Sequence, residues 1–306
     1  METRRIGSLE LSLAGLGCNN FGMGLDYDRS ARVIGAALDA GITFFDTADI
    51  YGSTESEVFL GRALAGRRDD AIVATKFGMR VDDERQGAKP EYVRRAAEDS
   101  LRRLNTDRID LYQLHQPDPT VPIAETLGAL DDLVRVGKVR EIGCSNFSAE
   151  QLRKARAACG PGARQFVSVQ NEYSLLHREP ERDVLPECER LGLKFLPFFP
   201  LASGLLTGKY RRGEPAPEGT RLTHTWAARF LTDERLATVD ALTAFARSRG
   251  HSVLELAMSW LASSGTIASV IAGATSPEQA RQNAAAVGWR LTESDRAEIA
   301  QLAPLK

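Results

Sequence analysis

The chain has 306 residues, of which 43% are apolar and 26% are charged, so it can bury a sizeable core and is not a disordered chain. Its 39 basic and 41 acidic residues give a net charge of −2, with no positive excess for a phosphate backbone, so nucleic acid is not an expected partner. No apolar run approaches the roughly 20 residues that a membrane span needs. Arg4 and Arg5 are followed by no hydrophobic leader. We therefore expect a cytoplasmic protein with no membrane partner.

Four cysteines lie far apart in the sequence and form no CxxC pair: Cys18, Cys144, Cys159 and Cys188. This spacing is typical neither of a disulfide framework nor of a zinc site. We therefore expect no structural disulfide and no metal.

Short apolar or β-branched runs alternate with amphipathic stretches along most of the chain. The runs that predict β-strands cover residues 13–17, 43–46, 71–75, 109–114, 140–144, 166–170, 194–198 and 268–271. The stretches between them place apolar residues at helical spacing, so that each would present one apolar face to a sheet. Asp28 is expected to precede the first helix. Ser148, with Gln151 three residues later, predicts a capping box at another.

The expected strands begin about every 30 residues, and only the interval between positions 194 and 268 breaks the period. A repeating βα unit of this length requires parallel strands with right-handed crossovers, and eight such units close into a (β/α)8 TIM barrel. We expect one α/β domain over residues 1–306, with an N-terminal β-hairpin turning at Gly7 and Ser8 and extra helices at 233–249 and 252–262. A doubly wound sheet is the rival fold, but no G-x-G-x-x-G follows the first strand.

Four ionisable residues stand at the carboxyl ends of consecutive strands, where the chemistry of such barrels collects. Asp46 ends the second strand and Tyr51 follows in its loop, while Lys76 and His115 end the third and fourth strands. Taken singly, each has an ordinary explanation as a cap, a loop aromatic, a solvated strand end or a hydrogen-bonded core histidine. Together on one face, they predict a catalytic site.

The four side chains suit the reduction of a carbonyl group. A ketone that accepts hydride becomes an alkoxide and needs a proton, and a phenol such as Tyr51 is a slow donor at its usual pKa of about 10. We expect the charge of Lys76 to lower the pKa of Tyr51, and Asp46 to hold Lys76 in place. His115 would hydrogen-bond the carbonyl oxygen and orient it.

The chain resembles the aldo-keto reductase family from the hairpin to the last helix. The resemblance is carried by GITFFDTADIYG, ATKFG and DLYQLHQPD around the four residues, and then by VGKVREIGCSNFS, VQNEYSL, PLASGLLTGKY and IAGATSPEQARQN, in order. It implies a barrel that transfers hydride from a nicotinamide dinucleotide to aldehydes and ketones. The family's Asp, Tyr, Lys and His tetrad is filled by Asp46, Tyr51, Lys76 and His115.

The resemblance also implies where the cofactor lies. The implied cofactor contacts are Ser145, Asn146, Gln170, Phe198, Leu201, Ser203, Leu206, Lys209, Gly273, Ala274, Thr275, Ser276, Gln279 and Asn283. An uncharged carboxamide needs one acceptor and donors, which an Asn and a Gln supply, and a helix amino end suits a phosphate. Phe198 stands where a tyrosine is frequent, and Phe199 replaces the usual serine. The sequence favours NADP(H), although NAD(H) stays open because Thr275 stands where NADP-specific relatives carry Arg or Lys.

We expect the substrate pocket to be formed by apolar residues near the loop ends: Phe21, Met23, Phe77, Phe147 and Trp226. Core packing is the alternative for each. Two other functional classes stay open: a nucleotide-sensing regulatory subunit with little turnover, and a Schiff-base aldolase using Lys76. The sequence indicates neither the physiological substrate nor the oligomeric state.

Overall fold

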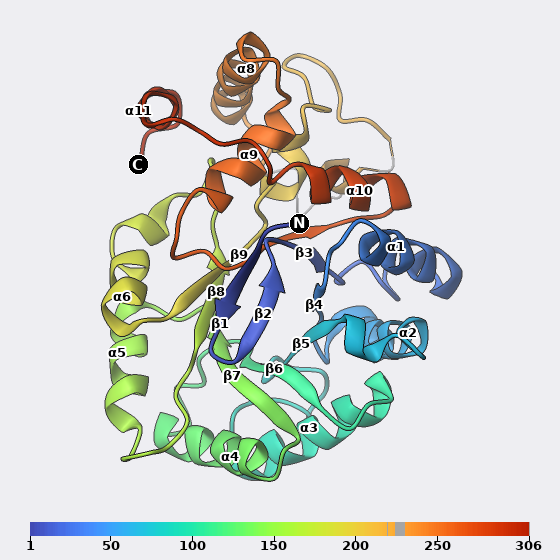
Figure 1. Ribbon diagram of the computed structural model, residues 1–306, viewed down its shortest axis with the longest axis vertical. Helices are drawn as coiled ribbons and strands as arrows, with labels where there is room; N and C mark the ends of the chain where they lie inside the picture. Colours follow the sequence, from blue (N-terminus) through green and yellow to red (C-terminus); the bar gives the residue numbers. More distant parts are fainter. Residues whose placement is uncertain (219, 224–229, 306) are drawn as a thin grey trace.

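The computed structural model describes residues 1–218, 220–223 and 230–305. Eight parallel strands follow one another around a barrel (Figure 1): β3 (Ala14–Gly17), β4 (Phe44–Asp46), β5 (Ile72–Phe77), β6 (Ile109–Leu114), β7 (Val139–Ser145), β8 (Ser168–Glu172), β9 (Lys194–Phe198) and β10 (Val270–Gly273). The ring closes between β9 and β10, where Phe195 donates to the Thr266 carbonyl and accepts from the Ala268 N–H. The predicted (β/α)8 barrel is therefore confirmed.

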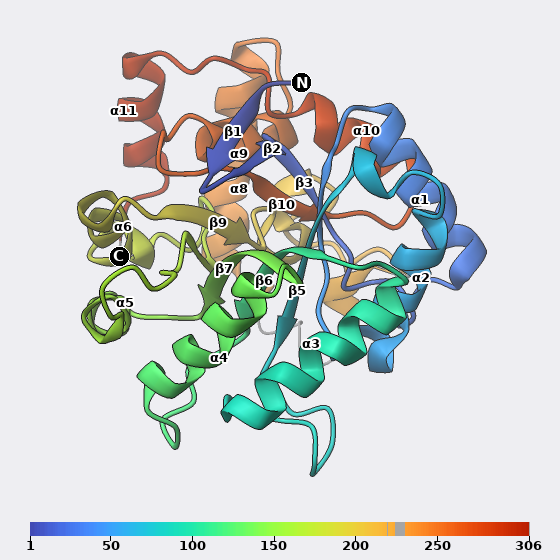
Figure 2. The same cartoon turned by 60° about the horizontal axis from the view of Figure 1, so that its bottom comes forward.

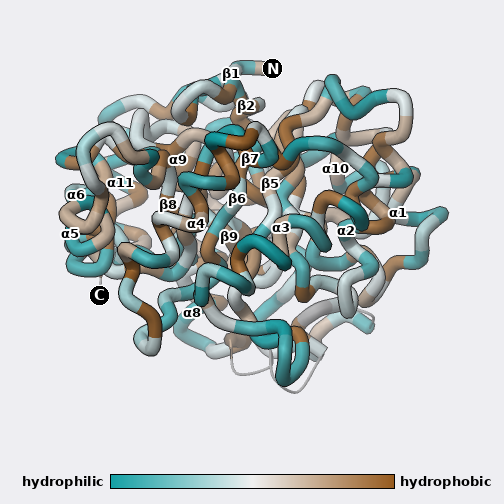
Figure 3. The backbone as a smooth tube through the Cα atoms, turned by 90° about the horizontal axis from the view of Figure 1, so that it is seen from below, coloured by the Kyte–Doolittle hydropathy of each residue, from teal (hydrophilic) through white to brown (hydrophobic). Residues whose placement is uncertain are grey.

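A β-hairpin covers the amino-terminal end of the barrel. Strands β1 (Thr3–Ile6) and β2 (Leu9–Ser12) pair antiparallel around a two-residue turn, in which Gly7 adopts a left-handed φ of 53°. The Ser8 N–H donates to Glu141 Oε1 at 2.7 Å, which ties the turn to β7. In Figure 3 the hairpin forms the top of the molecule, at one end of the barrel.

Ten helices of the described residues pack around the barrel: α1 (Tyr27–Asp39), α2 (Glu55–Ala63), α3 (Pro90–Leu104), α4 (Ile123–Arg135), α5 (Ala149–Ala158), α6 (Val184–Leu191), α8 (Asp233–Ser248), α9 (Val253–Ala262), α10 (Pro277–Ala285) and α11 (Glu293–Leu302). Short 3-10 turns lie between them: η1 (Tyr51–Thr54), η2 (Arg68–Asp70), η3 (Glu179–Glu181), η4 (Ala202–Thr207) and η5 (Arg221–Thr223). None of the helices in these ranges is both long and apolar enough to span a membrane.

Of the two helix starts predicted from the sequence, the one at Ser148 is confirmed and the one at Asp28 is not. The Ser148 capping box is confirmed, because Ser148 and Gln151 exchange hydrogen bonds at 2.8 and 3.3 Å. The prediction that Asp28 precedes the first helix was wrong. Helix α1 begins at Tyr27, and Asp26 caps it by accepting from the Arg29 N–H at 2.9 Å. Asp28 lies in the first turn, where its charge still suits the helix dipole.

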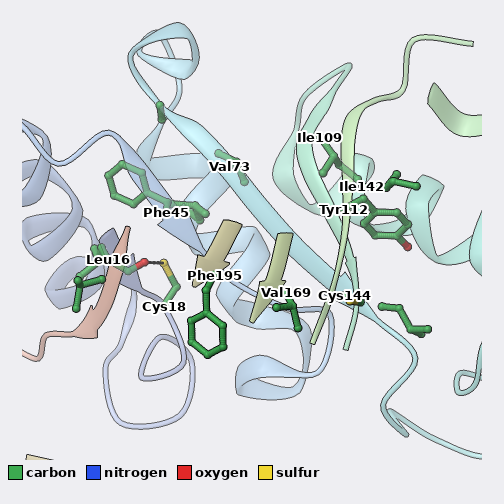
Figure 4. Close-up of a cluster of buried hydrophobic side chains, with 14 of the residues drawn as sticks. Leu16, Cys18, Phe45, Val73, Ile109, Tyr112, Ile142, Cys144, Val169 and Phe195 are labelled. Carbon is green, nitrogen blue, oxygen red and sulfur yellow. Dashed lines mark hydrogen bonds between the residues drawn. The ribbon is translucent and has the colours of Figure 1, made fainter. Parts of the chain in front are cut away.

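The strand residues alternate between two cores. Phe45 and its counterparts on the other strands point outward into the layer between barrel and helices, as the side chains labelled in Figure 4 show. Phe44, Ala74 and Leu111 point inward, where they pack against Leu9 and other apolar residues of the hairpin. This two-residue alternation follows from the strand pleat. The hairpin therefore plugs the lower barrel with apolar side chains.

Candidate active site

The same alternation brings predicted site residues together above the apolar plug. Asp46 stands two residues after Phe44 on the inner face, and Lys76 stands two residues after Ala74. His115 follows Leu111 by four residues and directly succeeds β6. All three side chains are at least 94% buried. The carboxylate, ammonium and imidazole thus lie inside the barrel at its carboxyl end.

Asp46 and Lys76 form a buried ion pair. Lys76 Nζ donates to Asp46 Oδ2 at 2.6 Å and to the Thr47 carbonyl at 2.8 Å. Burial opposes the charge of Lys76, but Asp46 and Tyr51 outweigh this effect and raise the pKa of the amine above its usual value. Lys76 is therefore a cation at neutral pH.

Tyr51 lies directly beside this pair. Lys76 Nζ is 5.1 Å from the centroid of the Tyr51 ring, and the ring is half-buried. Loss of water around the phenol raises its pKa above 10, Lys76 lowers it and Asp46 raises it, with a net upward direction. The expectation of a lowered pKa was therefore wrong, although the contribution of Lys76 has the predicted sign. The sequence indicated the neighbouring charge but not the desolvation.

His115 completes the group from the adjacent strand. Its ring meets the Tyr51 ring edge-on, with 5.7 Å between the centroids. Burial, reinforced by the charge of Lys76, holds the pKa of His115 well below its usual 6.5. The imidazole is therefore neutral at pH 7 and carries a single N–H.

Two glutamines hold the other oxygen of Asp46. Gln170 Nε2 donates to Asp46 Oδ1 at 2.9 Å, and Gln113 Nε2 donates to the same oxygen at 3.2 Å. Gln170 was expected only as a cofactor contact, and Gln113 was not expected at the site. The strand pleat could have identified Gln113, because it lies two residues before His115 on the same inward face.

The predicted carboxamide contacts lie next to this network. Ser145, the last residue of β7, is paired in register with Gln170 of β8, and Ser145 Oγ donates to the Gln170 carbonyl at 2.7 Å. Asn146 Nδ2 donates to the His115 carbonyl at 2.9 Å. This bond fixes the Asn146 side chain and leaves its oxygen available as an acceptor.

Strained backbone is concentrated at this end of the barrel. In the described part of the chain, seven residues other than glycine have a positive φ, and six of these lie in loops that follow β4, β7 and β9: Ser53, Thr54, Asn146, Phe199, Ala202 and Ser203. Such a conformation costs about 1–3 kcal/mol per residue and is retained where surrounding contacts impose it, often at ligand sites. The strain therefore favours a binding role for these loops.

The loop after β9 carries another group of predicted cofactor contacts, Phe198, Leu201, Ser203, Leu206 and Lys209. Phe198 is half-buried and meets Phe199 edge-on, with ring centroids 5.2 Å apart. Leu206 is fully buried in a second core beside α8 and α9. Lys209 is exposed, with Nζ 5.3 Å from the centroid of the Tyr210 ring.

The remaining predicted cofactor residues surround the start of α10: Gly273, Ala274, Thr275, Ser276, Gln279 and Asn283. Ser276 caps the helix by accepting from the Gln279 N–H at 3.2 Å. Gln279 Oε1 accepts from the Thr275 N–H at 2.8 Å, and Asn283 Nδ2 donates to the Gly273 carbonyl at 3.2 Å. These bonds fix the segment between β10 and α10.

Among the described residues expected at the substrate pocket, the three phenylalanines are buried in the main core. Phe77 packs outside the barrel against Tyr112, with 4.7 Å between ring centroids, and Phe147 packs in the same layer against Phe166. Phe21 is also fully buried in the main core. Their packing favours core roles, since buried side chains leave no surface for a substrate. Met23 is 71% exposed, and Trp226 lies outside the described residues.

In the ranges that the structure describes, no group of three or more His, Cys, Asp or Glu side chains is arranged to hold a metal ion. Asp46 and Lys76 are instead paired with each other, and two glutamine amides hold Asp46. The arrangement can donate a proton and stabilise a developing oxyanion.

Comparison with known sequences gives matches over nearly the whole chain. The family model described as "Aldo/keto reductase family" matches residues 14–304. A relative from Bacillus subtilis, "Aldo-keto reductase YhdN", is 37% identical over 98% of this chain and 89% of its own length. "Probable aldo-keto reductase 1" from Glycine max is 34% identical over 97% of this chain and 86% of its own length.

Solved structures with the same fold are similarly related. The glycerol dehydrogenase AKR11B4 from Gluconobacter oxydans superposes with a TM-score of 0.84 and is 33% identical, covering 98% of this chain and 94% of its own. The holo form of the aldo-keto reductase AKR11C1 from Bacillus halodurans gives a TM-score of 0.83 at 32% identity, covering 99% and 96%. The chain belongs to the aldo/keto reductase family, and it is an NAD(P)H-dependent oxidoreductase that acts on small carbonyl compounds.

Proposed function

We propose that Tyr51 is the proton donor with which this enzyme reduces aldehydes and ketones to alcohols, within a single barrel domain over residues 1–306. The observation that carries the proposal is the position of Lys76, which contacts Asp46 Oδ2 at 2.6 Å and lies 5.1 Å from the Tyr51 ring. A cation at this place stabilises the phenolate that proton donation leaves behind.

Each member of the tetrad has a separate task. The phenol of Tyr51 has a raised pKa and keeps its proton at neutral pH until the carbonyl oxygen gains negative charge. Lys76 then stabilises the phenolate, and Asp46 holds Lys76 in place. Neutral His115 donates its single N–H to the substrate oxygen, which orients the carbonyl and stabilises the developing alkoxide.

A nicotinamide dinucleotide supplies the hydride when it is bound. The donors and acceptors of Ser145, Asn146 and Gln170 suit its uncharged carboxamide, and the half-buried ring of Phe198 suits a stacking role against the nicotinamide. The segment from Leu201 to Lys209 and the start of α10 would hold the phosphates. Support comes from the strained backbone after β9 and from the amino end of α10, where the helix dipole favours an anion.

We propose further that NADPH is preferred over NADH. Arg281 lies in the second turn of α10 and its guanidinium is more than half exposed, 3.6 Å from Glu278. A second phosphate near Thr275 would offer Arg281 a doubly charged partner in place of that exposed carboxylate. The test is kcat/KM with NADPH divided by kcat/KM with NADH. We expect this ratio to exceed one in the wild type and to be lower in Arg281→Ala. A higher kcat/KM with NADH would contradict it.

A Schiff-base aldolase is disfavoured by the same geometry. A nucleophilic lysine must lose its proton, whereas Asp46 and Tyr51 raise the pKa of Lys76. Borohydride trapping in the presence of an aldehyde should therefore leave Lys76 unlabelled.

Replacement of the phenol tests the proposed role directly. Tyr51→Phe should lower kcat for aldehyde reduction by roughly 1000-fold, because general acid catalysis is lost. NADPH binding, measured by fluorescence titration, should stay unchanged. Tyr27→Phe, at the start of α1, is the matched control and should keep full activity.

Retained turnover in Tyr51→Phe would refute the role of Tyr51. If the wild-type protein binds NADPH tightly but reduces no member of an aldehyde panel, a nucleotide-sensing regulatory subunit would replace the enzymatic proposal.

A further inference from the structure

A second buried polar cluster lies on the outer side of the barrel wall, behind Lys76. The strand pleat points Thr75 and Tyr112 outward, into the layer that α2 and α3 cover (Figure 2). Glu57 reaches this layer from α2, and Arg103 reaches it from α3. The loop between β4 and η1 adds Asp49, which lies three residues after Asp46 and two before Tyr51.

Glu57 is well satisfied in this cluster. The side chain is fully buried, and it accepts from Arg103 Nε at 2.6 Å and from Thr75 Oγ1 at 2.5 Å. Both of its oxygens therefore have a donor, and one of the donors carries a full positive charge. Glu57 is therefore fully paired within the cluster.

Asp49 is poorly satisfied by comparison. Only 3% of its surface is exposed, yet its one side-chain partner is the Tyr92 hydroxyl, 3.4 Å from Oδ2. Asp49 Oδ1 and the Tyr112 hydroxyl are buried without a hydrogen-bond partner in the described part of the chain. Arg103 contacts the Glu57 carboxylate, and its charge acts on Asp49 as well.

The charges around Asp49 favour its uncharged form. Burial and the neighbouring Glu57 carboxylate raise the pKa of Asp49 to about 7, although Arg103, the Ile50 N–H and the Tyr92 hydroxyl act in the opposite direction. Burial and Asp49 raise the pKa of the Tyr92 phenol, and Arg85 and Arg95 only partly oppose this rise. Tyr112 faces the cluster as an uncharged phenol, because burial and Asp49 raise its pKa.

The backbone links Asp49 to the catalytic residues. The Asp49 N–H donates to the Lys76 carbonyl at 3.1 Å. Directly after Tyr51 the chain passes through three successive positive φ values, 57° at Gly52, 54° at Ser53 and 83° at Thr54. This strained turn keeps its shape only because the contacts around it impose it.

We propose that Asp49 is a positioning residue, an inference that rests on the proposed role of Tyr51. Its uncharged carboxyl group packs between β5, α2 and α3 and holds the strained loop that presents Tyr51. Loss of the proton to solvent puts a second negative charge beside Glu57. Glu57 and Arg103 lie on helices that pack against the barrel, so we expect the loop to respond to this repulsion by moving away. Its movement displaces Tyr51 from Lys76 and slows proton donation.

Tyr92 contacts both Asp49 and a cavity of the protein. Tyr92 lines a cavity of about 810 Å³ between the β5–α3 and β6–α4 loops. The cavity lining begins at Gly78 and Gln116, the residues that directly follow Phe77 and His115. Solvent therefore reaches the ring whose hydroxyl contacts Asp49.

The test is the pH profile of kcat for aldehyde reduction by wild type and Asp49→Asn, whose amide keeps the shape but cannot ionise. Wild-type kcat should fall roughly tenfold between about pH 6 and about pH 8, since small displacements at a reacting centre have effects of that size or larger. Asp49→Asn should lose this step and keep only the decline at higher pH that the Tyr51 phenol causes. Tyr92→Phe removes a donor that favours the carboxylate, so its step should move to higher pH.

The exposed Asp69→Asn serves as the control for net charge and should keep the wild-type profile. Identical profiles in wild type and Asp49→Asn would overturn the inference, and so would a Tyr92→Phe step that does not move. If Asp49→Asn does not fold, the direction of the Tyr92→Phe shift still decides. Failure of the proposed function shows differently, as activity retained in Tyr51→Phe.

Discussion

The two sides of the β4–β5 wall hold buried carboxyl groups three residues apart in the sequence, and they differ in how these groups are satisfied. Inside the barrel, Asp46 has Lys76 on one oxygen and two glutamine amides on the other. Outside the barrel, the one side-chain donor to Asp49 in the described chain is the Tyr92 hydroxyl at 3.4 Å, and Asp49 Oδ1 has no partner there.

The comparison shows that burial alone does not decide whether a carboxyl group ionises. Both groups are 3% exposed, so both lose nearly all contact with water. Asp46 accepts from three side-chain donors, one of which is the Lys76 cation. Asp49 instead competes with Glu57 for Arg103. The carboxylate of Asp46 therefore has a partner for each of its oxygens, whereas burial and Glu57 raise the pKa of Asp49 to about 7.

The largest effect is expected when the inner pair is broken. Lys76→Met leaves Asp46 buried without a cation, and such a loss costs about 3–5 kcal/mol of folding free energy. The kcat should fall by roughly 1000-fold because the phenolate of Tyr51 loses its counter-charge. Chemical denaturation and single-turnover kinetics measure the two effects.

The outer counterpart of this change is Arg103→Met. It should also destabilise the fold, but with a much smaller loss of kcat, because Arg103 contacts Glu57 and not the tetrad. Equal losses of kcat in the two variants would show that the two sides of the wall do not differ as the contacts indicate.

A smaller effect is expected when Asp46 loses one amide donor. Gln113→Leu removes the 3.2 Å bond to Asp46 Oδ1 and should lower kcat about tenfold while NADPH affinity is kept, because a hydrogen bond to a charged group contributes about 1.5–3 kcal/mol. The control is Tyr112→Phe, the preceding residue on β6, which points to the outer side. Its hydroxyl has no partner in the described residues, so its loss should be neutral or stabilising. Wild-type kcat in Gln113→Leu would show that Gln113 does not contribute to the function of Asp46.

The sequence predicted the inner side of the wall better than the outer side. The barrel, the positions of Asp46, Lys76 and His115 at strand ends, and their convergence follow from the strand period and the parallel topology. Gln113 follows from the same period and was missed. Phe77 was expected at the substrate pocket. It directly follows Lys76 on β5, however, and adjacent residues of a strand point to opposite faces, so the sequence already places Phe77 on the outer side.

The outer cluster could not be predicted in the same way. Asp49, Glu57 and Arg103 come from a loop and two helices, and no strand pleat relates them. Their meeting depends on how α2 and α3 pack on the barrel. The net rise in the pKa of Tyr51 was missed for a similar reason, since the degree of desolvation is a property of the packed structure.

The smallest effect, a shift in the pH dependence of the free energy of unfolding, is expected when the repulsion between Glu57 and Asp49 is relieved. Glu57→Gln keeps an oxygen for Thr75 and removes the negative charge beside Asp49, so the pKa of Asp49 should fall from about 7. In the wild type, the folded protein holds this proton up to about pH 7, whereas the unfolded chain loses it near the ordinary value of 3.8. The free energy of unfolding should therefore fall as pH rises between these values and level off above them. In Glu57→Gln the decline should end at lower pH, which thermal denaturation at a series of pH values measures. Adding Asp49→Asn to Glu57→Gln should abolish the remaining decline, and a decline that persists in the double variant would mean that another group carries the proton.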